Sequence, residues 1–185
     1  MSGGREGDGN GARAPAEAAC RGGTHIVIDL AAQRLRLYQG RRLLDEYPVS
    51  TGANGAGEWQ GSGCTPRGRH VVRAMIGAGA AENTVFVGRR PTGERYSPAL
   101  AGRHPGRDWI LTRILWLSGQ EPGFNRGGRR DTLRRFIYIH GCPDSEPMGI
   151  PRSHGCIRMR NWDIIALFER VEKGTPVEIR EQADG

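Results

Sequence analysis

Short apolar stretches with the two-residue period of β-strands alternate with glycine-rich turns through most of this chain. The run 24–30, THIVIDL, is rich in β-branched residues, and the run 34–39, RLRLYQ, alternates polar with apolar positions. Only three residues separate these runs, and another short turn precedes a third apolar run over 43–52. These short connections predict an antiparallel meander at the start of a sheet.

The same reasoning predicts further strands downstream, over 69–76, 84–90, 109–117, 136–141 and 175–180. One segment has the period of a helix instead. It begins at Asn161, a predicted N-cap, and ends at Lys173 and Gly174. Its apolar positions recur at spacings of three and four, at Ile164, Leu167, Phe168 and Val171. We therefore expect a mostly-β domain with one helix near its C-terminal end.

Composition sets limits on the organisation of the chain and on its partners. Residues 1–22 are rich in glycine, alanine and charge, so we expect a disordered tail before one domain over 23–181. The tail has no apolar core of a secretory signal peptide, and no run of about 18 apolar residues predicts a membrane span. The net charge of +7 favours anionic partners, but the arginines are dispersed and not interleaved with aromatic residues. A nucleic-acid-binding protein is therefore the weaker interpretation.

A histidine and a cysteine stand close together in the segment 153–159, SHGCIRM. A cysteine attacks as a thiolate, and it needs a histidine close in space to take its proton. His140, at the end of a predicted strand, is held more rigidly than His154, which is only two residues from Cys156. Gly155 allows a tight backbone whose exposed amides can bind an oxyanion.

Two other chemistries fit the same residues. The pairs His140-x-Cys142 and His154-x-Cys156 supply four nitrogen and sulfur ligands suited to zinc, although the spacing is unusual for a structural site. A disulfide between Cys142 and Cys156 requires an oxidising compartment and close Cα atoms. From the residues alone, a nucleophile, a metal site and a disulfide all stay open.

The segment 136–168 resembles the core motif of the L,D-transpeptidase (YkuD-like) catalytic domain. That family carries a His-Gly on a strand, then a loop, then Ser-His-Gly-Cys-hydrophobic-Arg, then a helix. The upstream segments PVSTG and TPRGRHVV resemble further parts of the family pattern, so the likeness spans about residues 24–180. The resemblance implies a mostly-β sandwich or barrel with one helix after the cysteine.

The resemblance also implies roles for individual residues. Cys156 matches the family nucleophile and His140 the base that activates it. Gly141 matches the residue whose carbonyl orients the imidazole, and amides at Gly155 and Cys156 match the oxyanion hole. The resemblance further implies a substrate-binding group of residues, which comprises Ser153, His154 and Arg158.

The implied activity is acyl transfer without a cofactor or metal. Cys156 would be acylated by a peptidoglycan stem tetrapeptide with loss of D-Ala, and an amine would take the acyl group to form a 3→3 cross-link. Water as acceptor would make the protein an L,D-carboxypeptidase, and the zinc-binding module is a further alternative. Carbapenems and other β-lactams would be inhibitors. The family implies the periplasm or cell envelope, although the chain shows no signal peptide, and Cys142 departs from the small polar residue common in the family.

Overall fold

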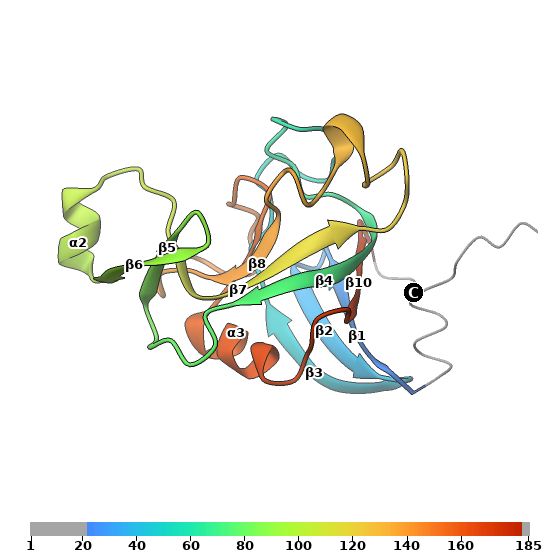
Figure 1. The fold of residues 1–185 in the computed structure, drawn as a ribbon, viewed down its shortest axis with the longest axis horizontal. Coiled ribbons are helices and arrows are strands. Elements are labelled where there is room, and N and C mark those ends of the chain that lie inside the picture. Colours follow the sequence, from blue (N-terminus) through green and yellow to red (C-terminus); the bar gives the residue numbers. More distant parts are fainter. Residues whose placement is uncertain (1–21, 183–185) are drawn as a thin grey trace, which may run out of the picture.

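The computed structural model describes residues 22–182, in which one sheet of ten strands dominates (Figure 1). Most of the predicted tail over 1–22 lies outside the described residues, so the boundary at residue 23 stays a prediction. The strands are β1 (Thr24–Asp29), β2 (Arg34–Gln39), β3 (Arg42–Pro48), β4 (Gly68–Ile76), β5 (Thr84–Val87), β6 (Arg90–Arg95), β7 (Ile110–Gly119), β8 (Tyr138–Gly141), β9 (Ile157–Met159) and β10 (Pro176–Arg180). The helices are α2 (Pro98–Arg103), α3 (Asn161–Phe168) and a short 3₁₀ turn, η1 (Gly128–Arg130).

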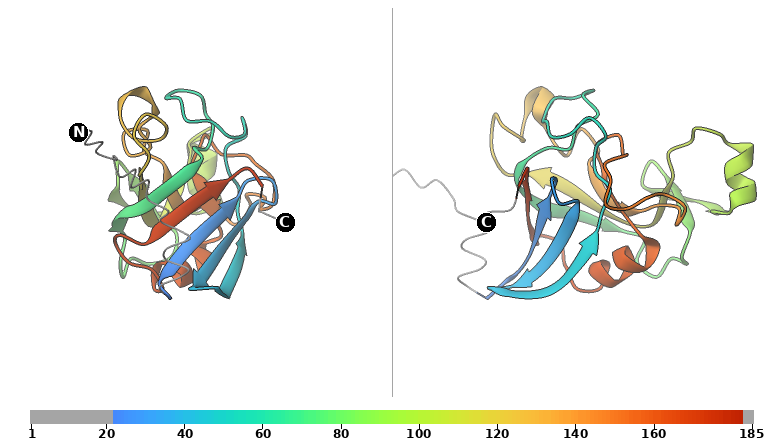
Figure 2. Two further views of the ribbon diagram at one scale, coloured as in Figure 1. Left: turned by 90° about the vertical axis from the view of Figure 1, so that its right-hand side faces the viewer. Right: turned by 180° about the vertical axis from the view of Figure 1, so that it is seen from behind.

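The sheet brings the two ends of the domain together. Strands β1, β2 and β3 form the predicted antiparallel meander. The last strand, β10, then pairs in parallel with β1 and antiparallel with β4, so it lies between them, as the left view of Figure 2 shows. From β4 the sheet continues to β7, which pairs with β5 at its start and with β8 along its middle. Strand β9 completes this branch beside β8.

An isolated pair of hydrogen bonds closes this path on itself. The backbone of Ser50, just after β3, pairs with the backbone of Arg158 in β9 through bonds of 3.0 and 2.9 Å. The path β3-β2-β1-β10-β4-β7-β8-β9 thereby returns to its starting strand. This closure gives the sheet a barrel-like form and places the segment after β3 against the segment that carries the cysteine.

The main apolar core fills the inside of this curved sheet. It takes side chains from β1, β2, β4, β7, β8, β9 and β10. Helix α3 packs against β7 and β8 and contributes Ile164, Leu167 and Phe168 to the same core. Burial of these three side chains fixes the helix directly after the strand that follows Cys156. No helix within residues 22–182 is long and apolar enough to cross a membrane.

The predicted mostly-β fold with a helix after the cysteine is confirmed, and three details differ. The N-cap of α3 is Arg160 rather than Asn161, and the helix ends at Phe168 instead of continuing to Lys173. Strands β6 and β9 and helix α2 were not predicted. With β5, strand β6 and helix α2 form an arm at the opposite end of the molecule from β1–β3 (Figure 1).

Candidate active site

The residues singled out in the sequence meet on one face of the β8–β9 pair. The two strands run parallel, with Ile139 opposite Ile157. These two isoleucines point into the main core, so their neighbours point to the opposite face. That outer face carries Tyr138, His140, Cys156 and Arg158.

The hydrogen bonding of His140 fixes which ring nitrogen carries the proton. Its Nδ1 lies 2.7 Å from the carbonyl oxygen of Gly141. A carbonyl only accepts, so Nδ1 bears the hydrogen and Nε2 keeps its lone pair. Within the described part of the chain, this buried Nε2 has no hydrogen-bond partner. Burial lowers the pKa of His140, so the ring is neutral at pH 7.

Only glycine fits at position 141. A Cβ there would lie 2.6 Å from both the carbonyl oxygen of Leu111 and the side-chain oxygen of Asn161. The same tight packing holds the Gly141 carbonyl in place for the imidazole. The His-Gly pair of the sequence is thus one unit, in which the glycine lets the backbone come close enough to orient the ring.

The thiol of Cys156 is half-buried and lies against the backbone of the neighbouring strand. The amide of Tyr138 donates to Sγ at 3.4 Å, and Sγ donates to the carbonyl of Phe136 at 3.4 Å. Burial raises the pKa of Cys156 to about 12, so the resting group is a thiol. There is no hydrogen bond between Cys156 and His140. Across adjacent strands and two residues along, their Cα atoms lie about 8 Å apart.

Gly155 lets the backbone in front of Cys156 approach the glycine-rich loop 52–64. Its φ is +129°, and a Cβ would lie 3.0 Å from the carbonyl oxygen of Cys64. The hydroxyl of Thr65 donates to the Gly155 carbonyl at 2.9 Å and accepts from the Gly52 amide at 2.8 Å. The upstream Ser-Thr-Gly and Thr-Pro segments therefore support the turn that presents Cys156.

Ser153 ties this turn together and uses one of the two predicted oxyanion donors. Its hydroxyl donates to the Cys156 carbonyl at 2.5 Å and accepts from the Gly155 amide at 3.1 Å. The Gly155 amide is therefore occupied. The Cys156 amide makes no hydrogen bond to any residue in 22–182, so it alone of the two is free to bind a ligand oxygen.

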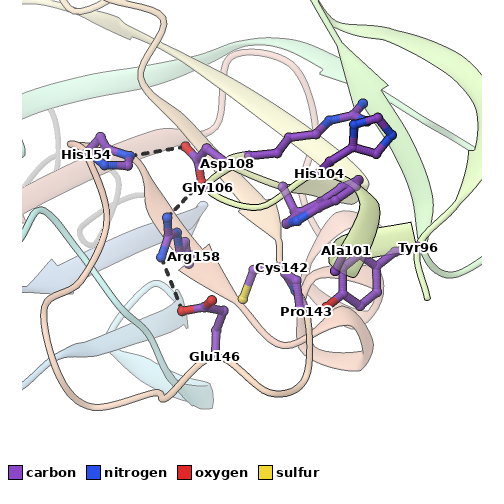
Figure 3. A pocket seen from close by; sticks show the side chains of 12 residues that line it. Tyr96, Ala101, His104, Gly106, Asp108, Cys142, Pro143, Glu146, His154 and Arg158 are labelled. Atoms are coloured by element: carbon purple, nitrogen blue, oxygen red, sulfur yellow. Dashed lines mark hydrogen bonds and ion pairs between the residues drawn. The ribbon is translucent and has the colours of Figure 1, made fainter. Parts of the chain in front are cut away.

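Arg158 is held by two carboxylates, neither of which the sequence analysis singled out. It donates to Asp108 at 2.7 Å and lies 3.5 Å from Glu146 (Figure 3). Asp108 also lies 3.5 Å from Nδ1 of His154, whose side chain is 81% exposed. Burial acts to raise the pKa of Asp108, but the nearby His140 and Arg158 outweigh it and lower that pKa. Asp108 thus stays ionised and fixes Arg158.

Three adjoining hollows meet at His154. One of about 470 Å³, the nucleophile cavity, contains Cys156 together with Arg89, Asp108, Arg135, Phe136 and Tyr138. A second, of about 300 Å³, shares Asp108 and His154 with it and extends past Arg158 to Cys142 (Figure 3). A third, of about 410 Å³, shares His154 and Arg135. The hollow that contains Cys156 therefore adjoins two others at His154.

The residues proposed for a zinc site do not gather. Within residues 22–182, no group of three or more histidine, cysteine or acidic side chains could hold a metal ion. Cys142 is buried and donates to the Met159 carbonyl, and it follows Tyr138, the neighbour of Cys156, by four residues. Four strand residues span about 13 Å, well beyond the Cα separation of a disulfide. The geometry favours neither the zinc module nor a Cys142–Cys156 bridge.

Sequence reasoning missed Asp108, Tyr138 and Arg89. Asp108 precedes β7 and belongs to no motif, and the other two lie in a strand and a turn to which the sequence analysis gave no functional role. Tyr138 meets Cys156 through the pairing of β8 with β9, whereas Asp108 and Arg89 reach it only through the pairing of β7 with β8 and with β5. An acidic residue directly before a long apolar strand was the one available signal, and it is weak.

Comparison with known proteins decides the family. The model of the L,D-transpeptidase catalytic domain (YkuD) matches residues 23–179. The chain belongs to this family. The putative L,D-transpeptidase YkuD of Bacillus licheniformis is 27% identical over 154 residues, which cover 83% of this chain and 64% of that protein. The chain thus spans less than two thirds of that relative.

Solved structures share the fold of this L,D-transpeptidase family member. Bd1075 of Bdellovibrio bacteriovorus matches with a TM-score of 0.55 and 17% identity, covering 87% of this chain and 49% of that one. L,D-transpeptidase 3 of Mycobacterium tuberculosis, solved in complex with a faropenem-derived adduct, matches with a TM-score of 0.51 and 17% identity. This match covers 86% of this chain and 61% of that one. At these identities the likeness establishes the fold.

Proposed function

We propose that this domain is a cysteine acyltransferase of the L,D-transpeptidase type, with Cys156 as nucleophile and His140 as base. The observation that carries the proposal is the unpaired Nε2 of His140 on the face that bears Cys156. A buried nitrogen without a partner costs free energy in the resting protein. Its free lone pair can accept the proton of the thiol, and the thiolate left beside it would stabilise the charged imidazole that burial alone disfavours.

In the first half-reaction, Sγ turns from the Phe136 carbonyl towards His140 and transfers its proton to Nε2. Sulfur then bonds to the carbonyl carbon of the donor peptide, and the free Cys156 amide stabilises the oxygen that becomes negative. Collapse of this intermediate breaks the carbon–nitrogen bond. The proton on His140 passes to the leaving amine, and a thioester with neutral His140 remains.

In the second half-reaction, an amine of a second peptide attacks the thioester. His140 takes the proton that the amine loses, and the carbon–sulfur bond breaks. The proton then returns to the thiolate, which restores the thiol. Water in place of the amine gives hydrolysis by the same steps, so the acceptor alone separates a transpeptidase from a carboxypeptidase.

The family and the site together support a peptidoglycan substrate. The donor is a stem tetrapeptide that loses D-Ala, and the product with an amine acceptor is a 3→3 cross-link. This reaction belongs to the periplasm or cell envelope, where the wall lies. Asp108, which holds Arg158 and His154, joins Ser153 as a positioning residue. No step requires a cofactor or a metal.

Incubation with purified muropeptides and mass spectrometry of the products tests the proposal. The wild-type protein should release D-Ala and form cross-linked dimers, and a penem or carbapenem should add one adduct to the intact protein. Both results should disappear in Cys156→Ala, because Cys142, the other thiol close to His140 in the chain, is buried and donates to the Met159 carbonyl. Cys64→Ala is the matched control, since Cys64 is a free thiol in the adjoining loop.

Two results would contradict the assignment. One is an adduct that persists in Cys156→Ala but is lost in Cys64→Ala. The other is cross-linking that continues unchanged when His140 is replaced by glutamine, which cannot take up a proton at neutral pH.

A further inference from the structure

The nucleophile cavity contains two arginines whose charges no acidic residue within 22–182 neutralises. Arg89 and Arg135 both line this cavity, and neither forms an ion pair with any residue in 22–182. The carboxylate that also lines it, Asp108, is bound to Arg158 at 2.7 Å. The cavity around Cys156 is therefore left with unpaired positive charge.

Arg89 occupies a backbone conformation that favours glycine. It is the second central residue of the two-residue turn between β5 and β6, in which Val87 pairs with Arg90. Gly88 and Arg89 have φ values of +55° and +64°, which are those of a tight hairpin turn with two left-handed residues. Glycine, asparagine or aspartate are the usual residues there, and a non-glycine residue costs about 1 kcal/mol or more.

The side chain of Arg89 is clamped above the cavity. Its guanidinium carbon lies 4.2 Å from the ring centre of Trp116 and 5.2 Å from that of Phe136. One nitrogen donates to the hydroxyl of Tyr138 at 3.0 Å. Burial raises the pKa of Tyr138, so this phenol stays neutral and does not cancel the arginine charge. These contacts fix the position of the guanidinium but, among the residues that the structure describes, leave its charge unpaired and most of its N–H groups without an acceptor.

Tyr138 links Arg89 directly to the nucleophile. Its hydroxyl accepts from Arg89, and its backbone amide donates to Sγ of Cys156. One tyrosine side chain therefore spans the interval between the guanidinium and the reacting sulfur. An arginine offers five N–H donors in a planar fork, and among residues 22–182 only one of them has an acceptor here.

Arg135 serves a different purpose. Its terminal nitrogens donate to the carbonyls of Gly57 and Cys64, at 3.1 and 2.6 Å, and reach the hydroxyl of Ser62 at 3.4 Å. These bonds hold the glycine-rich loop against the site. Three of its five N–H groups already bond to this loop, so Arg135 holds the loop and is not the group that we assign to a ligand.

We propose that Arg89 binds a carboxylate of the acyl donor and so determines which donors acylate Cys156. A carboxylate matches the unused fork of the guanidinium, and the clamp by Trp116 and Phe136 leaves the edge of that fork available. The inference rests on the proposed acyl transfer and adds a requirement on the donor. Two sources fit: the terminal carboxylate of the leaving residue, or a side-chain carboxylate on the residue that is acylated.

Matched synthetic donors separate these sources. One peptide carries both carboxylates, a second has its terminal carboxylate as an amide, and a third has its side-chain carboxylate as an amide. With wild-type protein, the amide at the position that Arg89 recognises should lower kcat/KM by about 10- to 100-fold, the range for a charged hydrogen-bonded pair. The amide at the other position should have little effect.

The same three donors are then tested on variants. Arg89→Gln should lose the preference for donors with the recognised carboxylate. The substitution should lower kcat/KM for those donors alone, which brings them to the level of the amide donor. Arg89→Lys, which keeps the charge but not the planar fork, should retain part of it. Arg90→Gln, an exposed arginine at the next position, is the control and should keep the wild-type ratio. Thermal melting confirms that each variant is folded.

The result that overturns the proposal is an unchanged ratio between donors in Arg89→Gln, whether or not the absolute rates fall, since a merely structural role lowers all rates together. This failure is distinct from failure of the acyl transfer itself. If the wild-type protein releases no residue from any donor, or if Cys156→Ala releases it at the same rate as wild type, the proposed acyl transfer and the proposed role of Arg89 are both wrong.

Discussion

At the scale of single residues, the position of the thiol depends on two glycines that have no room for a side chain. Gly141 brings its carbonyl to His140, and Gly155 brings the turn before Cys156 against Cys64. In both places a backbone carbonyl oxygen, that of Leu111 at Gly141 and that of Cys64 at Gly155, occupies space that a Cβ would need. The positions of the His140 ring and the Cys156 thiol therefore depend on the glycines beside them.

Gly155→Ala tests this dependence, with Gly149→Ala as its counterpart. Both glycines have a positive φ, +129° and +81°, but only at position 155 would a Cβ meet another atom, the Cys64 carbonyl at 3.0 Å. Each change should cost about 1–3 kcal/mol of stability from backbone strain. Only Gly155→Ala should also slow acylation of Cys156, by about 100-fold, because it displaces the sulfur. Equal acylation rates in the two variants, measured by stopped-flow or mass spectrometry, would refute the argument.

At the scale of elements, the start of α3 is tied to three separate segments. Asn161, the first residue of the helix, accepts from the Thr112 hydroxyl at 2.6 Å. It donates to the Cys142 carbonyl at 3.1 Å and to the Asn83 side chain at 3.0 Å. The helix is therefore joined to β7, to the end of β8 and to the segment before β5 by one buried side chain.

Replacement of Asn161 by alanine should lower the free energy of unfolding by about 2–4 kcal/mol, because it leaves buried polar groups without partners. Trp162→Ala, one position along the same helix, removes a side chain that is 71% exposed and should change stability by less than about 0.5 kcal/mol. Urea unfolding at pH 7 measures both. A loss below 1 kcal/mol in Asn161→Ala would show that the helix is held by its apolar face alone.

The elements also show which parts of the fold a sequence can predict. The meander β1–β3 and the strand before His140 have clear alternation, and the helix after Cys156 has a clear apolar period. By contrast, β6 is polar and almost wholly exposed, and β9 has only three residues, so neither has a detectable pattern. Helix α2 buries only Leu100, which gives no periodicity to detect. The predicted end of α3 was wrong because Val171 packs on the core from a turn beyond the helix.

The candidate site divides in the same way. Cys156, His140 and their glycines lie in one short stretch with a specific motif, so they could be predicted. Arg89 and Asp108 are far from that stretch in sequence and reach it through the antiparallel pairs that β7 makes with β5 and β8. The order of strands in the sheet depends on which apolar faces are buried together across the whole domain. The local patterns of a single sequence do not reveal which strands pair, so they do not predict that Arg89 and Asp108 lie near Cys156.

At the scale of the whole molecule, a second buried histidine makes stability depend on pH. His70 in β4 is bound to the Gly68 carbonyl and to the Thr132 hydroxyl, each at 3.0 Å. Burial lowers its pKa to about 4, from an ordinary value near 6.5. The stabilising contribution of the neutral ring is complete above pH 6.5, and it is lost as the pH falls towards 4 because the unfolded chain binds the proton first.

The wild-type protein should therefore lose about 3 kcal/mol of stability between pH 6.5 and 4 through His70 alone, at about 1.4 kcal/mol for each pKa unit. His70→Asn is less stable at pH 7 but should show a correspondingly smaller decrease on acidification. His104→Asn, at an exposed position, should keep the wild-type pH dependence. Denaturant titrations at several pH values measure the slopes. Parallel curves for wild type and His70→Asn would refute the assignment.

The insertion of β10 between β1 and β4 has a consequence for biosynthesis. A ribosome makes the cysteine turn before it makes the strand that joins the two halves of the sheet. Until β10 emerges, β1 and β4 each lack one neighbouring strand. The closed path of strands that positions Cys156 therefore cannot form. A nascent or C-terminally shortened chain should therefore be unable to attack its substrate, so reactivity arises only once synthesis of the domain has finished.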